Sequence, residues 1–304
     1  MSRFLILVFS YASLLLLFNS CDKDEYYIEE LVNVVSDEEY EMVGKIGIKI
    51  SGYMSQSAGG YVQGADCYGD YLFQFLDSNS AVNIYNLREK KYLETVEMIP
   101  NKSNHCNNIS FSRLYYKKSD VFPLLYVSSC RGSYSHLQVY RILLRQDSSF
   151  SIEQVQEIIL PKATHDNNLY WTGAVIDNDN NFMYIYANTN GAQIAKFNIP
   201  DVNQEEVVLT DEDILEQFTL EKFIHQQGAV IYKGMMYVFD GVPQWGDTNY
   251  LRIIDLVNRD DFAKINISEK GLKAEPEGAF IYNDILYCAT NNSGIFKVKL
   301  DFLE

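Results

Sequence analysis

Positive charge is scarce in this sequence. The 304 residues include 25 Lys and Arg against 41 Asp and Glu, which gives a formal net charge of −16. Half of it lies between Cys21 and Glu41, where nine acidic residues accompany one lysine. With that segment and Arg3 set aside, residues 42–304 still carry −9. A protein that follows a nucleic-acid backbone needs a basic patch to bind phosphates. We therefore expect no nucleic-acid partner.

Cysteine is also infrequent, and its spacing excludes the common metal motifs. The five cysteines contain no C-x-x-C pair, so we predict no structural zinc site and no cofactor. The sequence also lacks a G-x-S-x-G elbow, a phosphate-binding loop and a Ser/His/Asp order. These absences favour a binding protein over an enzyme.

The amino terminus carries an apolar run that is too short and wrongly flanked for a transmembrane span. Residues 1–20 combine this run with Arg3, a pattern typical of a secretory signal. Ser20-Cys21 and the acidic stretch 22–25 resemble the processing site of Bacteroidota-type lipoproteins, although Phe18 stands where that motif usually has Leu. The resemblance implies a lipidated Cys21, an outer-membrane anchor and surface exposure. The alternative is an ordinary secreted protein. We expect residues 21–42 to form an acidic tether and residues 43–304 to form one domain.

One short pattern recurs along that domain. HQQGAVIYKGMMYVFDG (225–241) returns as EPEGAFIYNDILYCAT (275–290), and related copies occur earlier. Each copy contains a small or amide residue, here called the anchor, that opens an apolar strand. A Gly/Asn/Asp turn and a second strand rich in Tyr, Phe and Val follow, which predicts a hairpin. The anchors are Gly64, Asn108, Gly173, Gly228 and Gly278, at spacings of 44, 65, 55 and 50 residues.

The repeats predict an all-β fold built from antiparallel units. A third strand follows each hairpin and a fourth follows in the first four units, as in 92–96 and 152–155. The fifth unit ends at its third strand, and an unassigned strand at 45–50 precedes the first unit. Residues ~43–300 thus resemble five-bladed β-propellers of four-stranded blades, closed by an amino-terminal strand. The alternative is a six-bladed ring with a degenerate blade between Gly173 and Gly228, although residues 211–223 there favour a short amphipathic helix.

The first strand of each blade would line a central channel, and polar residues precede every anchor. Alternation along a strand predicts that the positions one and three before the anchor share a face. These ten side chains would form two stacked polar rings at one mouth, with Trp171 and Trp245 on adjacent loops as stacking surfaces. They are Gln63, Asn107, Thr172, Gln227 and Glu277 in one ring, and Tyr61, His105, Tyr170, His225 and Glu275 in the other. The residues directly after the anchors, four of them alanine, should face the crowded axis.

The positions of the histidines and cysteines in the repeats bear on a metal site and on a disulfide. His105 and His225 belong to blades that are not neighbours, so we predict no metal site. Cys106 opens the first strand of the second unit and Cys130 closes its second strand, so antiparallel pairing predicts a disulfide between them. The remaining Cys67 and Cys288 are expected to be small buried hydrophobic residues.

Three hypotheses follow for function. The first is a lipid-anchored envelope propeller that binds a glycan, another cell-envelope component or a small molecule at the polar mouth. The second is a glycan-active hydrolase or lyase that uses Glu275, Glu277 and His225. Five-bladed arabinanase-like and fructosidase-like hydrolases, however, carry three acidic residues on the inner strands of successive early blades, where this chain has Gln63, Asn107 and Thr172. The third is a protein-interaction scaffold for an envelope partner.

Overall fold

The part of the chain that the structure describes folds into β-strands, and its helical segments are short 3₁₀ turns. The computed structural model describes residues 26–35, 41–55, 60–77, 81–99, 106–129, 136–161, 173–188, 191–291 and 293–303. Within these ranges the helical segments are η1 (Asp211–Asp213), η2 (Pro243–Trp245), η3 (Ser268–Lys270) and η4 (Asp301–Leu303). Over the same part of the chain, none is long and apolar enough to span a bilayer.

Three of the sheets are separate antiparallel meanders, as the repeat pattern predicts. The first runs β1-β2-β22-β21-β20, the second β11-β12-β13-β15 and the third β16-β17-β18-β19. The first consists of β1 (Tyr26–Val35), β2 (Glu41–Met54), β20 (Pro276–Tyr282), β21 (Ile285–Thr290) and β22 (Gly294–Leu300). The second consists of β11 (Gly173–Asp177), β12 (Phe182–Asn188), β13 (Ala192–Asn198) and β15 (Glu216–Leu220). The third consists of β16 (Gln226–Tyr232), β17 (Met235–Asp240), β18 (Tyr250–Asp255) and β19 (Asp260–Asn266).

The remaining strands join two such meanders at their outer edges. The order β3-β4-β5-β6 continues into β10-β9-β8-β7 because β6 and β10 pair in parallel, and β14 adds to β10. The repeat pattern did not predict this parallel contact. The strands are β3 (Val62–Tyr68), β4 (Tyr71–Leu76), β5 (Ala81–Asn86), β6 (Lys91–Ile99), β7 (Cys106–Phe111), β8 (Leu125–Ser129), β9 (His136–Leu144), β10 (Phe150–Ile159) and β14 (Glu206–Val208).

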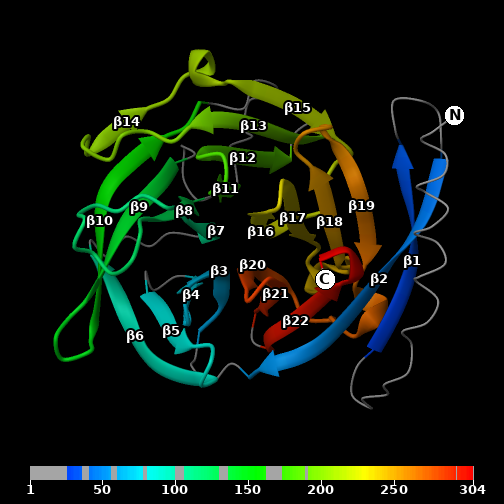
Figure 1. Cartoon of the computed structure of the whole chain (residues 1–304), viewed down its shortest axis with the longest axis horizontal. Coiled ribbons are helices and arrows are strands. Elements are labelled where there is room, and N and C mark those ends of the chain that lie inside the picture. The colour runs from blue at the N-terminus through cyan, green and yellow to red at the C-terminus, as the bar shows by residue number, and fades with distance from the viewer. Residues whose placement is uncertain are drawn as a thin grey trace, which may run out of the picture.

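The first strands of the five repeats stand around a common centre (Figure 1). Going round it, β3 packs beside β7, β7 beside β11, β11 beside β16, β16 beside β20, and β20 beside β3 again. The strand predicted at 45–50 lies within β2, which pairs antiparallel with β22, for example Ile50 with Val298. The amino-terminal part of the described chain therefore completes the sheet that the carboxyl-terminal repeat begins.

Backbones approach each other closely at this centre, and the anchor glycines permit it. A Cβ on Gly228 would lie 2.5 Å from the Cα of Gly278, and a Cβ on Gly278 would lie 2.5 Å from the backbone N of Ala65. Real Cβ atoms do not come this close to backbone, so no larger residue fits without a shift of the strands. The close approach of the backbones at the axis therefore depends on the anchor glycines Gly228 and Gly278 and not on the alanines that follow them.

The alanines after the anchors pack between sheets, which corrects the prediction that they face the axis. Ala279 belongs to the apolar core between the β16–β19 sheet and the β20–β22 sheet, and Ala65 to the next core. Ala174 and Ala229 occupy the matching places in two further cores. The prediction failed because sheets arranged radially present their faces to neighbouring sheets and only their inner edge to the axis.

Asn108 is the one anchor that is not a glycine, and its side chain reaches across the centre to two other inner strands. Its amide Nδ2 donates to the carbonyl oxygens of Ala174 (2.7 Å) and Ala229 (3.1 Å), and its Oδ1 accepts the Ala229 N–H (3.0 Å). Asn108 is fully buried. One side chain from β7 thus ties together β7, β11 and β16 and fills the axis at this level.

Two further sequence predictions differ from the structure. Residues 211–223 do not form an amphipathic helix: they contain η1 and then β15, which pairs with β13. The exposure of β15 alternates from residue to residue, so its period is two and not 3.6. In addition, β1 lies inside the segment expected to be an acidic tether and pairs along its length with β2.

Candidate functional site

In four of the five repeats, the residue before the anchor sits in a β-bulge where the inner strand begins. The pairing of the inner hairpins shifts register at Val62/Gly64, Cys106/Asn108, Gln226/Ala229 and Pro276/Gly278. A bulge leaves the extra residue unpaired and redirects its side chain. The redirected side chains are all buried polar groups: Gln63, Asn107, Gln227 and Glu277. The bulge repeats with the anchor, so these groups reach the same end of the inner strands.

Two carboxylates at this end collect amide donors from several strands. Gln63 Nε2 donates to Glu277 Oε1 at 3.2 Å, and Gln227 Nε2 donates to Glu275 Oε1 at 3.2 Å. Glu275 Oε2 also accepts from the Nδ2 of Asn291 at 2.9 Å and from the Nε2 of Gln244. The two predicted rings are therefore not separate layers. Positions one and three before the anchor join in a single network that spans β3, β16 and β20, here called the polar mouth.

Glu277 is the buried member of the polar mouth, with 1% of its surface exposed. Burial raises the pKa of Glu277 well above its usual range, and the neighbouring Glu275 carboxylate raises it further by its charge and by a hydrogen bond to Glu277. Both effects favour the protonated form of Glu277. A proton shared between the two side chains would let them stay in contact where two negative charges would repel.

His225 and Trp245 form the exposed part of the site, and the partly buried Asp247 contacts His225. The Nδ1 of His225 lies 2.6 Å from Asp247 Oδ2, and the imidazole meets the Trp245 ring edge-to-face at 4.9 Å between centroids. Asp247 also accepts the N–H of Val242 (2.9 Å). Trp245 is 70% exposed. Because Gln244 and Trp245 belong to the same 3₁₀ turn η2, one turn supplies both a contact to Glu275 and an open aromatic surface.

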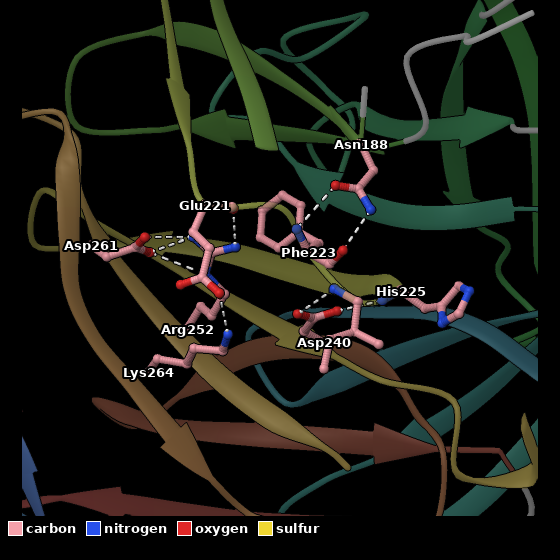
Figure 2. Close-up of polar contacts among 9 residues, drawn as sticks. Asn188, Glu221, Phe223, His225, Asp240, Arg252, Asp261 and Lys264 are labelled. Atoms are coloured by element: carbon pink, nitrogen blue, oxygen red, sulfur yellow. Dashed lines mark hydrogen bonds and ion pairs between the residues drawn. The ribbon is translucent and has the colours of Figure 1, made fainter. Parts of the chain in front are cut away.

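Buried polar groups hold the chain segment that leads into His225 (Figure 2). Asp240 accepts the backbone N–H groups of Ile224 (2.9 Å) and His225 (2.7 Å) through its two oxygens. Burial raises the pKa of Asp240, and these two hydrogen bonds oppose the shift. One step earlier, Asn188 brackets Phe223 by bonding to both its N–H and its C=O. Figure 2 shows the imidazole of His225 directed away from this cluster.

Arg252 supports the same segment from behind. Its guanidinium is fully buried, binds both oxygens of Asp261 (2.6 and 2.7 Å from Nη2) and donates to the carbonyl oxygen of Glu221 (2.7 Å). It also lies over the ring of Phe223, 4.5 Å from the centroid. A planar group with several donors suits such a buried position better than lysine would. The backbone at His225 is therefore fixed by the scaffold, while its ring stays at the surface.

The other predicted site residues divide into two groups. Tyr61 is 59% exposed and lies outside the described contacts of the network. Asn107 is buried at its bulge but does not join the Glu275–Glu277 pair. His105, Tyr170, Trp171 and Thr172 lie outside the described residues, as do Cys21 and Cys130. Lipidation and the disulfide therefore stay predictions. Cys106 pairs with Ser129, the residue before Cys130. In the described ranges, no group of three or more His, Cys, Asp and Glu is placed to hold a metal.

Sequence reasoning missed Gln244, Asp247 and Asn291. A signal was present, because the end of a hairpin's second strand lies beside the start of its first. The residues that follow the second strands of repeats four and five therefore reach the same mouth as those that precede the anchors. The loops after the second strands of repeats four and five, which contain all three residues, are therefore part of the candidate site.

Comparisons with known proteins give a fold likeness only. No family model matches the chain, and no curated protein matches it. Solved structures that resemble it include Myxococcus xanthus glutaminyl cyclase, with 9% identity, a TM-score of 0.49 and coverage of 82% of this chain and 94% of that one. A Bacteroides thetaiotaomicron protein of unknown function has 10% identity, a TM-score of 0.49 and coverage of 87% and 78%. The Cps50 (Swd1) β-propeller domain of Myceliophteria thermophila has 11% identity, a TM-score of 0.42 and coverage of 79% and 96%. These similarities identify neither a ligand nor a reaction for this chain.

Proposed function

We propose that the protein is a five-bladed β-propeller of the bacterial cell envelope that binds a glycan or another envelope component at the polar mouth. The anchor to the outer membrane would be a lipid on Cys21. The observation that carries the proposal is the continuous amide–carboxyl network that converges from three inner strands beside an exposed tryptophan.

The blade number rests on the ring of inner strands. Five strands, β3, β7, β11, β16 and β20, follow one another around the centre and return to the first. Each begins its own meander, and β2 supplies the outer strand that the last meander lacks. The interval between Gly173 and Gly228, where a sixth blade could be hidden, contains the ordinary outer strand β15 of its own sheet.

The chemistry of the polar mouth suits hydroxyl-rich ligands. Sugar hydroxyls both donate and accept hydrogen bonds, and the amides of Gln227 and Gln244 and the carboxylate of Glu275 offer both functions in one place. The face of a sugar ring packs well on an exposed aromatic side chain, which Trp245 supplies. Asn108 fills the axis behind the mouth, so we place the ligand in the mouth and not along a through-channel.

Glycoside hydrolysis by Glu275 and Glu277 fits the geometry poorly. Retaining glycosidases separate their two carboxyl groups by about 5–5.5 Å and inverting ones by more, which leaves room for the sugar or for water. Glu275 and Glu277 instead share a hydrogen bond, and Glu277 is almost inaccessible. We therefore propose binding rather than turnover.

A glycan array followed by affinity electrophoresis tests the proposal. We expect the wild-type protein to be retarded by at least one polysaccharide, and Trp245→Ala to bind it roughly 5-fold less tightly, since lost aromatic stacking costs about 1 kcal/mol. The double variant Gln227→Ala, Glu277→Ala should lose binding. Val257→Ala, which shortens an exposed side chain in the β18–β19 turn, is the matched control and should bind as wild type does.

Two results would contradict the proposal. One is the absence of binding to every polysaccharide, and the other is retardation that the double variant leaves unchanged. In either case, a protein that co-purifies through the outer rim would favour the scaffold hypothesis instead.

A further inference from the structure

The inner strands also end together, at the face opposite the polar mouth, and their ends line an open cavity there. It has a volume of about 300 Å³ and is lined by residues from the ends of β3, β7, β11, β16 and β20 and from the turns that follow them. Cavities of this size and larger hold small organic ligands. The polar mouth and this cavity share no residue, so each could bind a ligand independently of the other.

A buried carboxylate forms part of the cavity wall. Asp66 is 7% exposed, and its two oxygens accept the backbone N–H groups of Cys67 and Phe111, each at 2.7 Å. Each carboxylate oxygen has a further lone pair to offer. Among the described residues, no Lys or Arg pairs with Asp66, since Arg113, the one basic residue in the lining, binds Asp179 at 2.8 Å.

The charge and the aromatic content of the lining select the kind of ligand. The lining contains three aspartates, Asp66, Asp177 and Asp179, against the single Arg113. It also contains the rings of Tyr68, Phe111 and Tyr232. A carboxylate beside aromatic rings attracts organic cations through charge and through the ring quadrupoles. The three aspartates would repel an anionic ligand, and Arg113, the only basic residue in the lining, is already paired with Asp179.

We propose that this cavity binds a small organic ammonium ion, with the N–H groups directed at Asp66 and the alkyl part against the aromatic rings. The inference does not depend on glycan binding at the other face. Ser110 makes the same kind of contact between inner strands without a charge. Its hydroxyl oxygen accepts the N–H of Ile176 (3.1 Å), just as Asp66 accepts the N–H of Phe111. A neutral side chain is therefore sufficient to brace two inner strands, and the charge of Asp66 is left for a ligand.

The proposal predicts a pH dependence with a defined sign. Burial raises the pKa of Asp66 to about 7, against the two backbone hydrogen bonds that lower it. The other titratable or charged groups that line the cavity are Cys67, Tyr68, Arg113, Asp177, Asp179 and Tyr232. An ammonium ion binds the ionised form of Asp66, so affinity should rise with pH up to about 7 and level off above it. An alkylammonium keeps its own proton throughout this range.

Isothermal titration with butylammonium chloride, with 1-butanol as the neutral probe of similar size, tests the inference. We expect butylammonium to bind and butanol not to, and we expect about 10-fold weaker binding at pH 6 than at pH 7.5. Asp66→Asn should abolish binding, while the matched change Asp147→Asn, at the exposed β9–β10 turn, should leave it unchanged. Tyr232→Leu should weaken it about 5-fold by removing one ring.

The inference is overturned if butanol binds as well as butylammonium, if affinity does not change between pH 6 and 7.5, or if Asp66→Asn binds like the wild type. Should Asp66→Asn fail to fold, the pH profile of the wild type and the Tyr232→Leu variant decide the matter. Loss of glycan binding in the polar-mouth variants, with butylammonium binding intact, would separate the two sites.

Discussion

Replacing Asn108 by aspartate is expected to destabilise the protein by about 4 kcal/mol or more. The new carboxylate would keep an acceptor for the Ala229 N–H but would turn an oxygen towards the carbonyl groups of Ala174 and Ala229, which now receive the amide. Two carbonyls would lose their donor, and a charge would be buried on the axis. Urea unfolding, followed by tryptophan fluorescence, measures the loss.

The control for this prediction is Asn86→Asp. The Asn86 Oδ1 accepts the N–H of Glu89 at 2.9 Å in an exposed turn, and aspartate keeps that acceptor in contact with water. We expect a change within about 0.5 kcal/mol. If Asn108→Asp is as stable as Asn86→Asp, then Asn108 does not tie the inner strands together.

Replacing Gly278 by alanine is expected to cost about 3 kcal/mol or more, because the strands at the centre must move apart. The added Cβ would lie 2.5 Å from both the Cβ and the backbone N of Ala65, and backbone cannot rotate away as a flexible side chain can. The same urea titration measures this effect. A soluble variant with wild-type stability would show that the inner strands are farther apart than the structure has them.

Gly52→Ala provides the matched control, because Gly52 lies in β2 and a Cβ there would meet nothing within 4 Å. Glycine within a strand is entropically unfavourable, so alanine should be neutral or slightly stabilising at this position. The contrast between the two variants separates crowding at the axis from a general intolerance of alanine.

The hairpins could be predicted from sequence because they depend on local signals. The Gly-Ala-x-Ile-Tyr core, the Asn-Asp and Lys-Gly turns and the alternating strands all lie within one repeat, and the pairing of 45–50 with the last sheet followed from counting strands. The parallel contact of β6 with β10 and the addition of β14 are different. They depend on the distance between the outer strands of neighbouring sheets, and no pattern within one repeat predicts that distance.

The candidate site was predictable in part for the same reason. Gln227, Glu275 and Glu277 were found because the repeat aligns them, and they do contact one another or a common partner. The bulges before Gly64, Asn108, Gly228 and Gly278 were not predicted, because simple alternation along each strand was expected. For the same reason, the merging of the two expected rings into one network was not predicted. The role of Asn108 was missed as well, because an amide among glycines looks like a weaker copy of the anchor until its partners across the axis are known.

The most direct test of the central claim is a crystal structure of the protein with a polysaccharide fragment selected on the array. The account predicts a sugar ring against Trp245, with hydroxyl groups bonded to Gln227, Gln244 or Glu275. A fragment bound on the outer rim, or in the cavity around Asp66, with the polar mouth holding only water would contradict it.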